Sequence, residues 1–190
     1  KYSYGYSKYS FPFGVVPISD RVLDEAPKRG DVIVFRKPGD ESIDYIKRLV
    51  GLPKDTIQVK KGILFINSKK IKRVKTNIGI MKNVFGDEKV LTQYKETFDD
   101  TNSHQIIESS DNDPFDDTIE FKVPNGHFFF MGDNRDNSRD SRTPEVGFVP
   151  KKNLIGKAQI IFFSHNGSAS IFEFCNWHKS IRFSRIGKAI

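Results

Sequence analysis

The hydrophobic residues of this chain fall in short runs that alternate with polar residues or end at turn residues. Runs rich in β-branched and aromatic residues and bounded by Gly, Pro, Asn or Asp are typical of strands. Strands are predicted on this basis at residues 32–35, 44–50, 56–60, 63–67, 119–124, 126–131 and 154–164. No segment of convincing length repeats its apolar residues with the helical period of 3.6. The pattern therefore predicts a mainly β protein.

The alternation weakens between residues 77 and 124, where the composition becomes polar and then acidic. Residues 96–120 contain nine acidic side chains and neither Lys nor Arg. We interpret this segment as an insertion built of short hairpins and loops. Its Asp111-Asn112-Asp113 run lacks the glycine and the terminal glutamate of a calcium-binding loop. No metal or cofactor is therefore expected.

Composition limits the classes of function. The chain has 190 residues, 37% of them hydrophobic, which is enough for a real core, and its net charge of +7 favours anionic surfaces such as membranes or nucleic acids. Binding to nucleic acid is disfavoured because the aromatic residues are not interleaved with Lys and Arg. The single cysteine, Cys175, excludes an internal disulfide and a cysteine-based zinc site.

The first residues are aromatic and polar, without the apolar core of a signal peptide. Residues 1–14 hold four Tyr and two Phe among Ser, Gly and Pro, which suits either a membrane interface or packing under a sheet. No apolar run in the chain approaches the ~20 residues that a membrane-spanning helix needs. The chain begins with Lys1 instead of Met, so we expect that an original N-terminal segment has been removed.

A lysine, Lys47, lies inside the predicted strand at residues 44–50. Side chains alternate along a strand, so Lys47 shares a face with Tyr45 and Leu49. An ammonium on an apolar face is costly unless it is paired or loses its proton, and a neutral lysine can accept a proton from a nucleophile. An edge lysine whose amine reaches water is the alternative.

A polar loop, residues 132–142, follows the apolar strand at 126–131. It consists almost entirely of Asp, Asn, Arg and Ser, whose side chains bond to nearby backbone and to one another. Ser138 or Ser141 could orient the Lys47 amine, and Asp140, Arg142 and Arg48 could pair and hold the loop against the strand. A purely structural salt-bridge loop is the other interpretation, since spacing in a sequence cannot show contact.

Three segments, 28–35, 44–53 and 132–142, resemble three successive conserved boxes of the bacterial type I signal peptidases, and residues 147–150 and the tail also fit that family. The resemblance implies a signal-peptidase-like or repressor-protease-like antiparallel β core with a smaller inserted β-hairpin subdomain. The core would comprise residues 1–63 and 125–190, and the insertion residues 64–124. It implies a membrane-bound serine endopeptidase of the Ser–Lys dyad type. The enzyme would cleave signal peptides from exported preproteins at the outer face of the bacterial cytoplasmic (inner) membrane.

The resemblance also implies a role for individual residues. Lys47 corresponds to the general base, and Ser138 to the serine that orients it, while Arg48, Asp140 and Arg142 correspond to residues that brace the site. The positions that line the pockets for an Ala-x-Ala signal peptide, bound as an added strand, correspond to Asp44, Tyr45 and Ile46. Contact with membrane lipid is expected for Trp177, Tyr4 and Tyr6.

One departure from the family concerns the nucleophile. The Ser-Met-x-Pro-Thr box of the family is absent, and Ser10-Phe11-Pro12 matches only a fragment of it without the Thr. We therefore expect these 190 residues to carry the base but no nucleophile, and to be inactive alone. The alternative is a non-catalytic module with the same fold that binds signal peptides or membrane. A relative of the self-cleaving repressors is a further alternative, although those proteins lack the polar loop.

Overall fold

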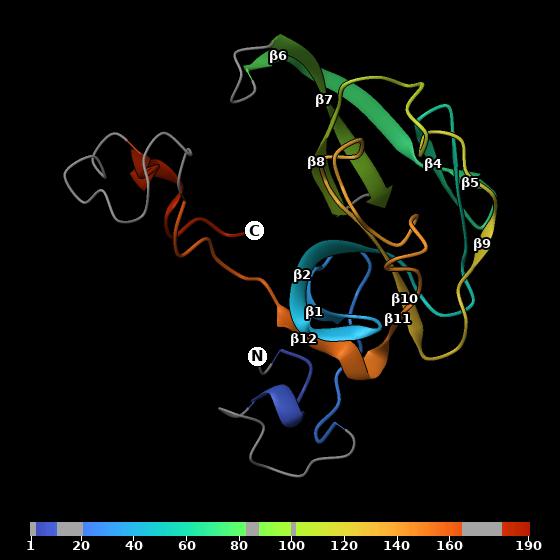
Figure 1. Cartoon of the computed structure of the whole chain (residues 1–190), viewed down its shortest axis with the longest axis vertical. Coiled ribbons are helices and arrows are strands. Elements are labelled where there is room, and N and C mark those ends of the chain that lie inside the picture. Colours follow the sequence, from blue (N-terminus) through green and yellow to red (C-terminus); the bar gives the residue numbers. More distant parts are fainter. Residues whose placement is uncertain (1–2, 11–20, 83–87, 100–101, 165–179) are drawn as a thin grey trace. The chain divides into compact units, whose positions relative to one another are not determined.

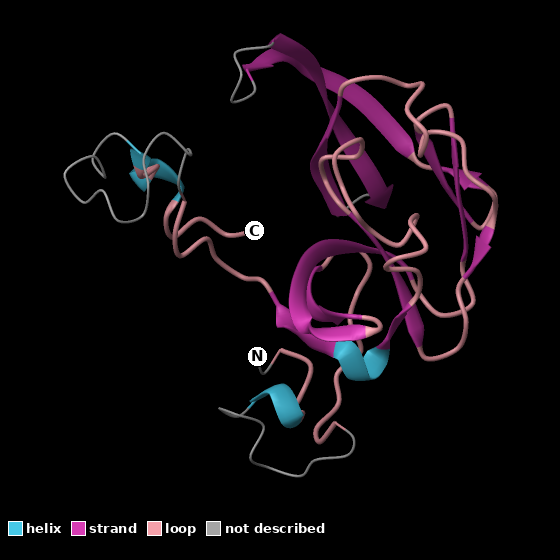
Figure 2. Ribbon diagram, in the orientation of Figure 1, coloured by secondary structure: helices cyan, strands magenta, loops and turns pink. Residues whose placement is uncertain are grey.

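The computed structural model describes residues 3–10, 21–82, 88–99, 102–164 and 180–190. It divides the chain into two compact units, Lys1–Lys157 and Ala158–Ile190. The first unit consists mainly of antiparallel strands, as Figure 2 shows, so the predicted mainly β class is confirmed. The described helical elements are the short 3-10 turns η1 (Lys8–Ser10), η3 (Lys151–Asn153) and η5 (Phe183–Arg185). The proposed boundaries of the inserted subdomain stay a prediction.

A five-stranded antiparallel sheet contains the strand with the lysine. Its order is β11 (Val149–Pro150), β10 (His127–Met131), β2 (Asp40–Gly51), β1 (Val32–Lys37) and β12 (Leu154–Lys157), all labelled in Figure 1. The strand predicted at 154–164 ends early, at Lys157. Lys157 pairs with Ile33 and β1 begins at Val32, so the strand has nothing left to pair with in β1.

A second sheet has the order β5 (Lys69–Lys70), β4 (Ile63–Ile66), β3 (Thr56–Lys60) and β9 (Phe121–Lys122). The β3–β4 hairpin turns at Lys61 and Gly62, which both have positive φ, the geometry of a tight hairpin turn. The predicted hairpin is therefore correct.

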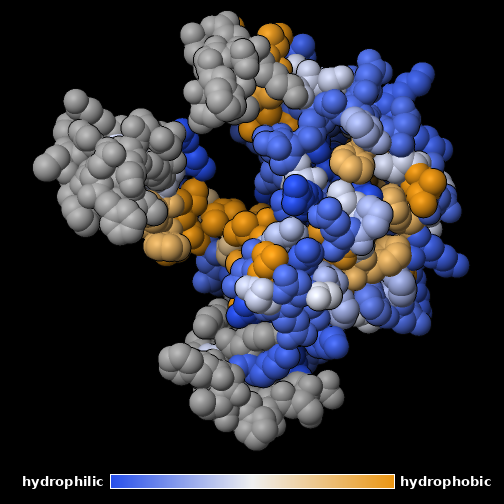
Figure 3. Space-filling model, in the orientation of Figure 1, coloured by the Kyte–Doolittle hydropathy of each residue, from blue (hydrophilic) through white to orange (hydrophobic). Residues whose placement is uncertain are grey.

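The third sheet corrects the prediction for the polar segment. Its strands β6 (Lys72–Lys82), β7 (Glu88–Asp99) and β8 (Asn102–Glu108) are long and continuous, and not the short hairpins expected. Backbone pairing along a ladder needs no apolar side chains, so the sequence lacks a clear alternation there. Some apolar side chains of this hairpin are exposed, among them Ile78, Ile80 and Val90, and Figure 3 shows hydrophobic atoms at its end.

Strand β10 lies between two apolar clusters, which explains why it is apolar throughout. Phe128 and Phe130 pack in one cluster with residues of β1 and β2, whereas Phe129 and Met131 pack in the other with residues of β3 and β4. Successive side chains of a strand point to opposite faces, so both faces of β10 are buried. The polar loop that follows therefore starts from a fixed point in the core.

Candidate active site

Lys47 lies on β2 with its side chain on the core face. It pairs with Ile33, and Tyr45 pairs with Phe35, while Leu49 is fully buried in the same apolar cluster. The predicted face is therefore correct. The neighbouring Ile46 points the other way and is 53% exposed. The strand thus presents the lysine to the protein and its neighbour to solvent.

The structure brings the Lys47 amine to the hydroxyl of Ser138, 91 residues away. Lys47 Nζ donates a hydrogen bond of 2.8 Å to Ser138 Oγ. The serine packs against Gly132 so closely that a Cβ added there would lie 2.1 Å from Ser138 Oγ and 3.5 Å from Lys47 Nζ. Only a residue without a side chain leaves room for this pair.

Two hydrogen bonds close the ends of the polar loop. The backbone N–H of Phe130 donates to Ser141 Oγ at 2.9 Å, and the N–H of Ser141 donates to the Phe130 carbonyl at 3.0 Å. Ser141 is therefore engaged with the strand, and Ser138 is the serine that contacts the lysine.

Asp140 and Arg142 form a fully buried bidentate pair within the loop. Arg142 Nε and Nη2 donate to the two carboxylate oxygens of Asp140 at 2.9 and 2.8 Å. The same carboxylate accepts the N–H of Gly132 at 2.9 Å, and Arg142 donates to the carbonyl of Arg135 at 2.5 Å. The pair thus fixes both the start and the middle of the loop.

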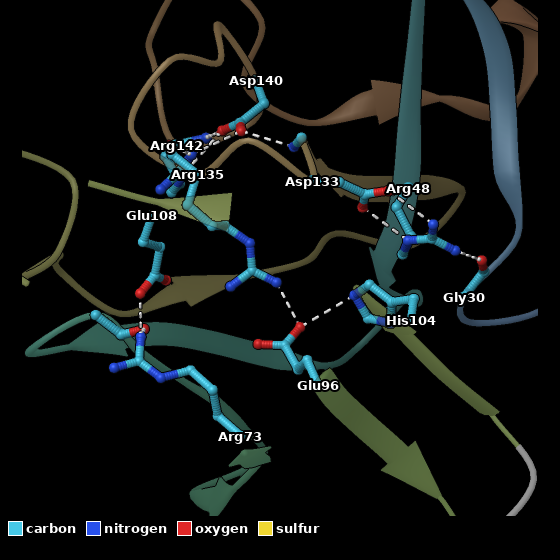
Figure 4. A network of polar contacts seen from close by, with 12 residues as sticks. Gly30, Arg48, Arg73, Glu96, His104, Glu108, Asp133, Arg135, Asp140 and Arg142 are labelled. Carbon is cyan, nitrogen blue, oxygen red and sulfur yellow. Dashed lines mark hydrogen bonds and ion pairs between the residues drawn. The ribbon is translucent and has the colours of Figure 1, made fainter. Parts of the chain in front are cut away.

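Arg48 braces the site through a partner that the sequence did not indicate. Its Nε and Nη2 donate to the Asp133 carboxylate at 2.8 and 2.7 Å, and its Nη1 donates to the Gly30 carbonyl at 2.8 Å (Figure 4). The sequence predicts a group of Asp140, Arg142 and Arg48, whereas in the structure Asp140 pairs with Arg142 and Arg48 pairs with Asp133. Asp133 stands in the same loop, but one acidic residue cannot be distinguished from another by composition.

The surroundings of Lys47 lower the pKa of its amine. Burial is the largest cause, and the positive charge of Arg142 acts in the same direction, while the negative charges of Asp140 and Asp133 oppose it. The hydrogen-bond partner, Ser138, is a neutral hydroxyl and adds no compensating charge. The amine is thereby shifted towards the neutral form, which can accept a proton.

A cavity of about 260 Å³ opens beside the amine. Its lining residues come from β1, β2 and the polar loop: Val32, Ile46, Lys47, Arg48, Gly132, Asp133, Asn134, Asn137 and Ser138. Strand β10 pairs with β2 only from Arg48 to Gly51. The part of β2 before Arg48, which includes Asp44, Tyr45 and Ile46, therefore has β1 on one side and no described strand on the other.

The aromatic residues expected at a membrane lie in different environments. Tyr4 is 4% exposed, packs in the core and donates from its hydroxyl to Asp31 at 2.8 Å, so the prediction of a lipid contact does not hold for Tyr4. Tyr6 is 39% exposed. Trp177 lies outside the described residues, as does Cys175.

Ser10 is not placed at the cavity. It is 3% exposed, its hydroxyl accepts a hydrogen bond from the N–H of Ser7 at 3.0 Å, and it is not among the residues that line the cavity of Lys47.

Three carboxylates form an acidic cluster outside the Lys47 site. One oxygen each of Asp113, Asp116 and Asp136 lies within 4.8 Å of the others. Asp136 also accepts the N–H and the hydroxyl of Ser109, both at 2.6 Å. These residues have the oxygen ligands that a hard cation would use, and the expectation that the protein needs no metal stays a prediction.

Fold and site together define a mainly β protein in which a half-buried lysine is held by a serine beside an open strand edge. The protein family described as "Signal peptidase, peptidase S26" matches residues 1–163. This chain belongs to that family, whose members are proteases that cleave signal peptides. The prediction of the family from the three boxes is therefore confirmed.

Curated relatives support the same assignment. Signal peptidase I of Rickettsia typhi (strain ATCC VR-144 / Wilmington) is 42% identical over an alignment 206 residues long, gaps included, which covers 99% of this chain and 76% of the relative. Signal peptidase I of Rickettsia prowazekii (strain Madrid E) is 41% identical with the same coverage. A crystal structure of a signal peptidase I from Enterococcus faecalis V583 aligns with 70% of this chain and 97% of that one, at 22% identity and a TM-score of 0.40. Within the described residues, we find no helix with the length and hydropathy to span a bilayer.

Proposed function

We propose that Lys47 is the general base of a Ser–Lys dyad that cleaves signal peptides from exported preproteins. The observation that carries the proposal is the amine with a lowered pKa, held by a neutral hydroxyl beside a cavity. The neutral amine takes the proton of a serine nucleophile as the serine oxygen bonds to the scissile carbonyl carbon. It returns this proton to the leaving amine as the peptide C–N bond breaks. Water then hydrolyses the acyl-enzyme.

The substrate would bind in an extended conformation along the open edge of β2. Unpaired N–H and C=O groups on this edge can form a ladder with an added strand, and side chains next to the edge then select the residues at alternate positions. Tyr45 is partly buried against Phe35, with ring centroids 6.1 Å apart, which restricts the room beside it. Small residues such as those of Ala-x-Ala fit such restricted room, whereas larger side chains would meet the wall.

We further propose that the protein acts at the outer face of the bacterial cytoplasmic membrane. The net charge of +7 would attract anionic lipid, and the exposed ring of Tyr6 could lie at the interface. Trp177 keeps its expected role there as a prediction. Lipid is thus the second partner, beside the preprotein.

A Lys47→Met substitution in the full-length gene product tests the role of the base. Methionine has a similar length but cannot accept a proton, so cleavage of a preprotein with an Ala-x-Ala site should fall by about 10³-fold or more. The matched control is Lys122→Met, which removes an exposed lysine from another strand, β9. If Lys47→Met cleaves as fast as the control, the proposed dyad is wrong.

The second measurement uses the 190 residues alone. Because the Ser-Met-x-Pro-Thr box is absent from them, we expect binding of a signal peptide without cleavage. Cleavage by these residues would contradict the expectation about the nucleophile. If the full-length gene product also binds without cleaving, the protein is the alternative, a non-catalytic binding module.

A further inference from the structure

The loop that carries Ser138 lies against the third sheet. The N–H of Ile107 on β8 donates to the carbonyl of Asp133 at 2.8 Å, and the N–H of Arg135 donates to the carbonyl of Ile107 at 2.9 Å. These two bonds form a parallel bridge between Ile107 and Asn134. The polar segment that showed no clear pattern in sequence thus supports the loop of the candidate active site.

The side chain of Arg135 extends from the loop to strand β7. It is 2% exposed and forms an ion pair with Glu96, which is 1% exposed. His104 on β8 lies on the other side of this carboxylate, with 3.3 Å between His104 Nε2 and Glu96 Oε2. Figure 4 shows Glu96 between the guanidinium and the imidazole. The loop is therefore connected to the sheet by a buried charge as well as by backbone.

The same arginine is connected to the site through its backbone. The carbonyl of Arg135 accepts the 2.5 Å hydrogen bond from Arg142, which holds Asp140, which in turn binds the N–H of Gly132. Ser138 packs directly on Gly132. A continuous series of contacts thus runs from Glu96 to the hydroxyl that holds Lys47.

The charges of the Glu96–Arg135 pair are strongly held. Burial alone would raise the pKa of Glu96, but the attraction and the hydrogen bond of Arg135, together with the adjacent His104, outweigh it and lower the pKa to about 2. Replacing a buried ion pair by well-packed apolar residues of similar volume is often neutral for stability, so such a pair is weak evidence for a stabilising role. The contact between Glu96 and Arg135 is directional, so it fixes the geometry of the loop better than an apolar contact would.

We propose that Glu96 is a positioning residue for the active site: by fixing the guanidinium of Arg135, it holds the polar loop so that Ser138 meets the Lys47 amine. This inference rests on the proposed role of Lys47 as the base. Glu96 itself does not line the cavity, and its effect passes through Arg135.

The test compares two double variants of the full-length gene product. Glu96→Gln/Arg135→Gln removes both charges and leaves neither unpaired, while Arg73→Gln/Glu108→Gln removes the neighbouring buried contact between Arg73 and Glu108 in the same sheet. We expect the first variant to lower kcat by about 10²-fold with KM little changed, because it moves a catalytic group by a fraction of an ångström to 1 Å. The second should keep kcat within about twofold of wild type. Similar melting temperatures in the two variants would show that the difference in kcat does not come from stability.

A direct measurement of the Lys47 amine needs no turnover. Lysine Nζ can be followed by ¹⁵N NMR in the 190 residues, and the amine should titrate below its ordinary value of 10.5 in the wild type. A loosened loop admits water, so the pKa should rise towards that value in Glu96→Gln/Arg135→Gln but not in the control. The ascending limb of kcat against pH should move to higher pH in the same variant.

Each outcome decides one point. If Glu96→Gln/Arg135→Gln keeps the kcat and the Lys47 pKa of the control, Glu96 has no positioning role. If this variant does not fold, Glu96→Asp replaces it, which keeps the charge but withdraws the carboxylate by one methylene, and a kcat equal to wild type would overturn the proposal. Failure of the dyad itself shows separately, as a Lys47→Met variant that still cleaves.

Discussion

Two regions of the molecule bury charged groups in opposite ways. Glu96 on β7 and Arg135 in the polar loop are both nearly inaccessible, and each compensates the charge of the other. Lys47 on β2 is only partly buried, but its hydrogen-bond partner is the neutral Ser138. Consequently the pKa of Glu96 is lowered, which favours its charged form, whereas the pKa of Lys47 is lowered, which favours its neutral form. Burial acts on both groups, and for Glu96 the charged partners outweigh its effect.

Glu108 is an intermediate case. It contacts Arg73, but its oxygen Oε1 is buried without a hydrogen-bond partner among the described residues. Burial outweighs the attraction of Arg73 and Arg135 and raises the pKa of Glu108 to about 8. An adjacent counter-charge is therefore not enough to keep the carboxyl group of Glu108 ionised at neutral pH.

Glu96→Gln alone should be the most damaging change to stability. It leaves the Arg135 guanidinium buried without its counter-charge, which costs about 3–5 kcal/mol. Urea unfolding followed by circular dichroism measures the loss. The double variant Glu96→Gln/Arg135→Gln should recover most of it, and a single variant as stable as wild type would show that the charge of Glu96 is not needed.

Gly132→Ala should reduce activity more than stability. The added methyl group would lie 2.1 Å from Ser138 Oγ, so the serine must move away from the Lys47 amine. We expect kcat to fall by about 10²-fold, measured with the full-length gene product. The control is Gly79→Ala, where nothing lies within 4 Å of the new methyl group. Equal activity of the two variants would exclude close packing as a requirement of the site.

Glu108 and Glu96 should give stability opposite dependences on pH. Glu108 keeps its proton in the folded protein up to about pH 8, while the unfolded chain loses it above the ordinary value of about 4.5, so its contribution falls as pH rises between these values. Glu96, with a pKa of about 2, contributes above its ordinary value and loses its contribution as pH falls towards 2.

Glu108→Gln should therefore remove part of the pH dependence. The free energy of unfolding of this variant, relative to wild type, should be higher at pH 8 than at pH 5, by on the order of 2 kcal/mol. Urea titrations at several pH values give this difference. A difference that does not change with pH would mean that Glu108 is ionised throughout, and that Arg73 alone is enough to hold its charge.

The exposed pair Lys8–Glu41 sets the lower end of the scale. Its atoms are 3.0 Å apart, but the side chains are 48% and 44% exposed, and water screens such a pair. Glu41→Gln should change the free energy of unfolding by less than about 1 kcal/mol. A larger loss would show that distance, and not burial, governs the value of ion pairs in this protein.

The local alternation of apolar and polar residues predicted those features that depend on neighbouring residues in the sequence. The strands around Lys47 and the face on which it lies followed from alternation, because pairing and burial act on successive residues. For the contact of Lys47 across 91 residues, residue types left Ser138 and Ser141 as alternatives, and the resemblance of both segments to one family indicated Ser138. The same resemblance gave no information on the polar segment, where Glu96 stands between Lys95 and Thr97 and resembles any other strand glutamate.

Tertiary contacts decided the remaining points. Glu96 reaches Arg135 because β7 and β8 lie under the loop, and no spacing rule connects residues 39 positions apart. Tyr4 and Tyr6 are both aromatic residues in one short segment, but Tyr4 packs in the apolar cluster and donates to Asp31, whereas Tyr6 is 39% exposed. Burial and pairing of this kind depend on which distant segment packs against a residue, and composition alone does not predict that.

The two hydrogen bonds between Phe130 and Ser141 have a consequence for the order in which the chain folds during synthesis. The loop closes on β10, and β10 joins β2 only after the intervening strands β3 to β9 have been made. Contacts between distant parts of a chain form late, because the loop between them must first be closed. In a nascent chain that has not reached these residues, Lys47 lacks the hydroxyl of Ser138 and the charges of the loop that surround its amine in the folded protein. The environment of this amine is therefore complete only after residues up to Arg142 have been made.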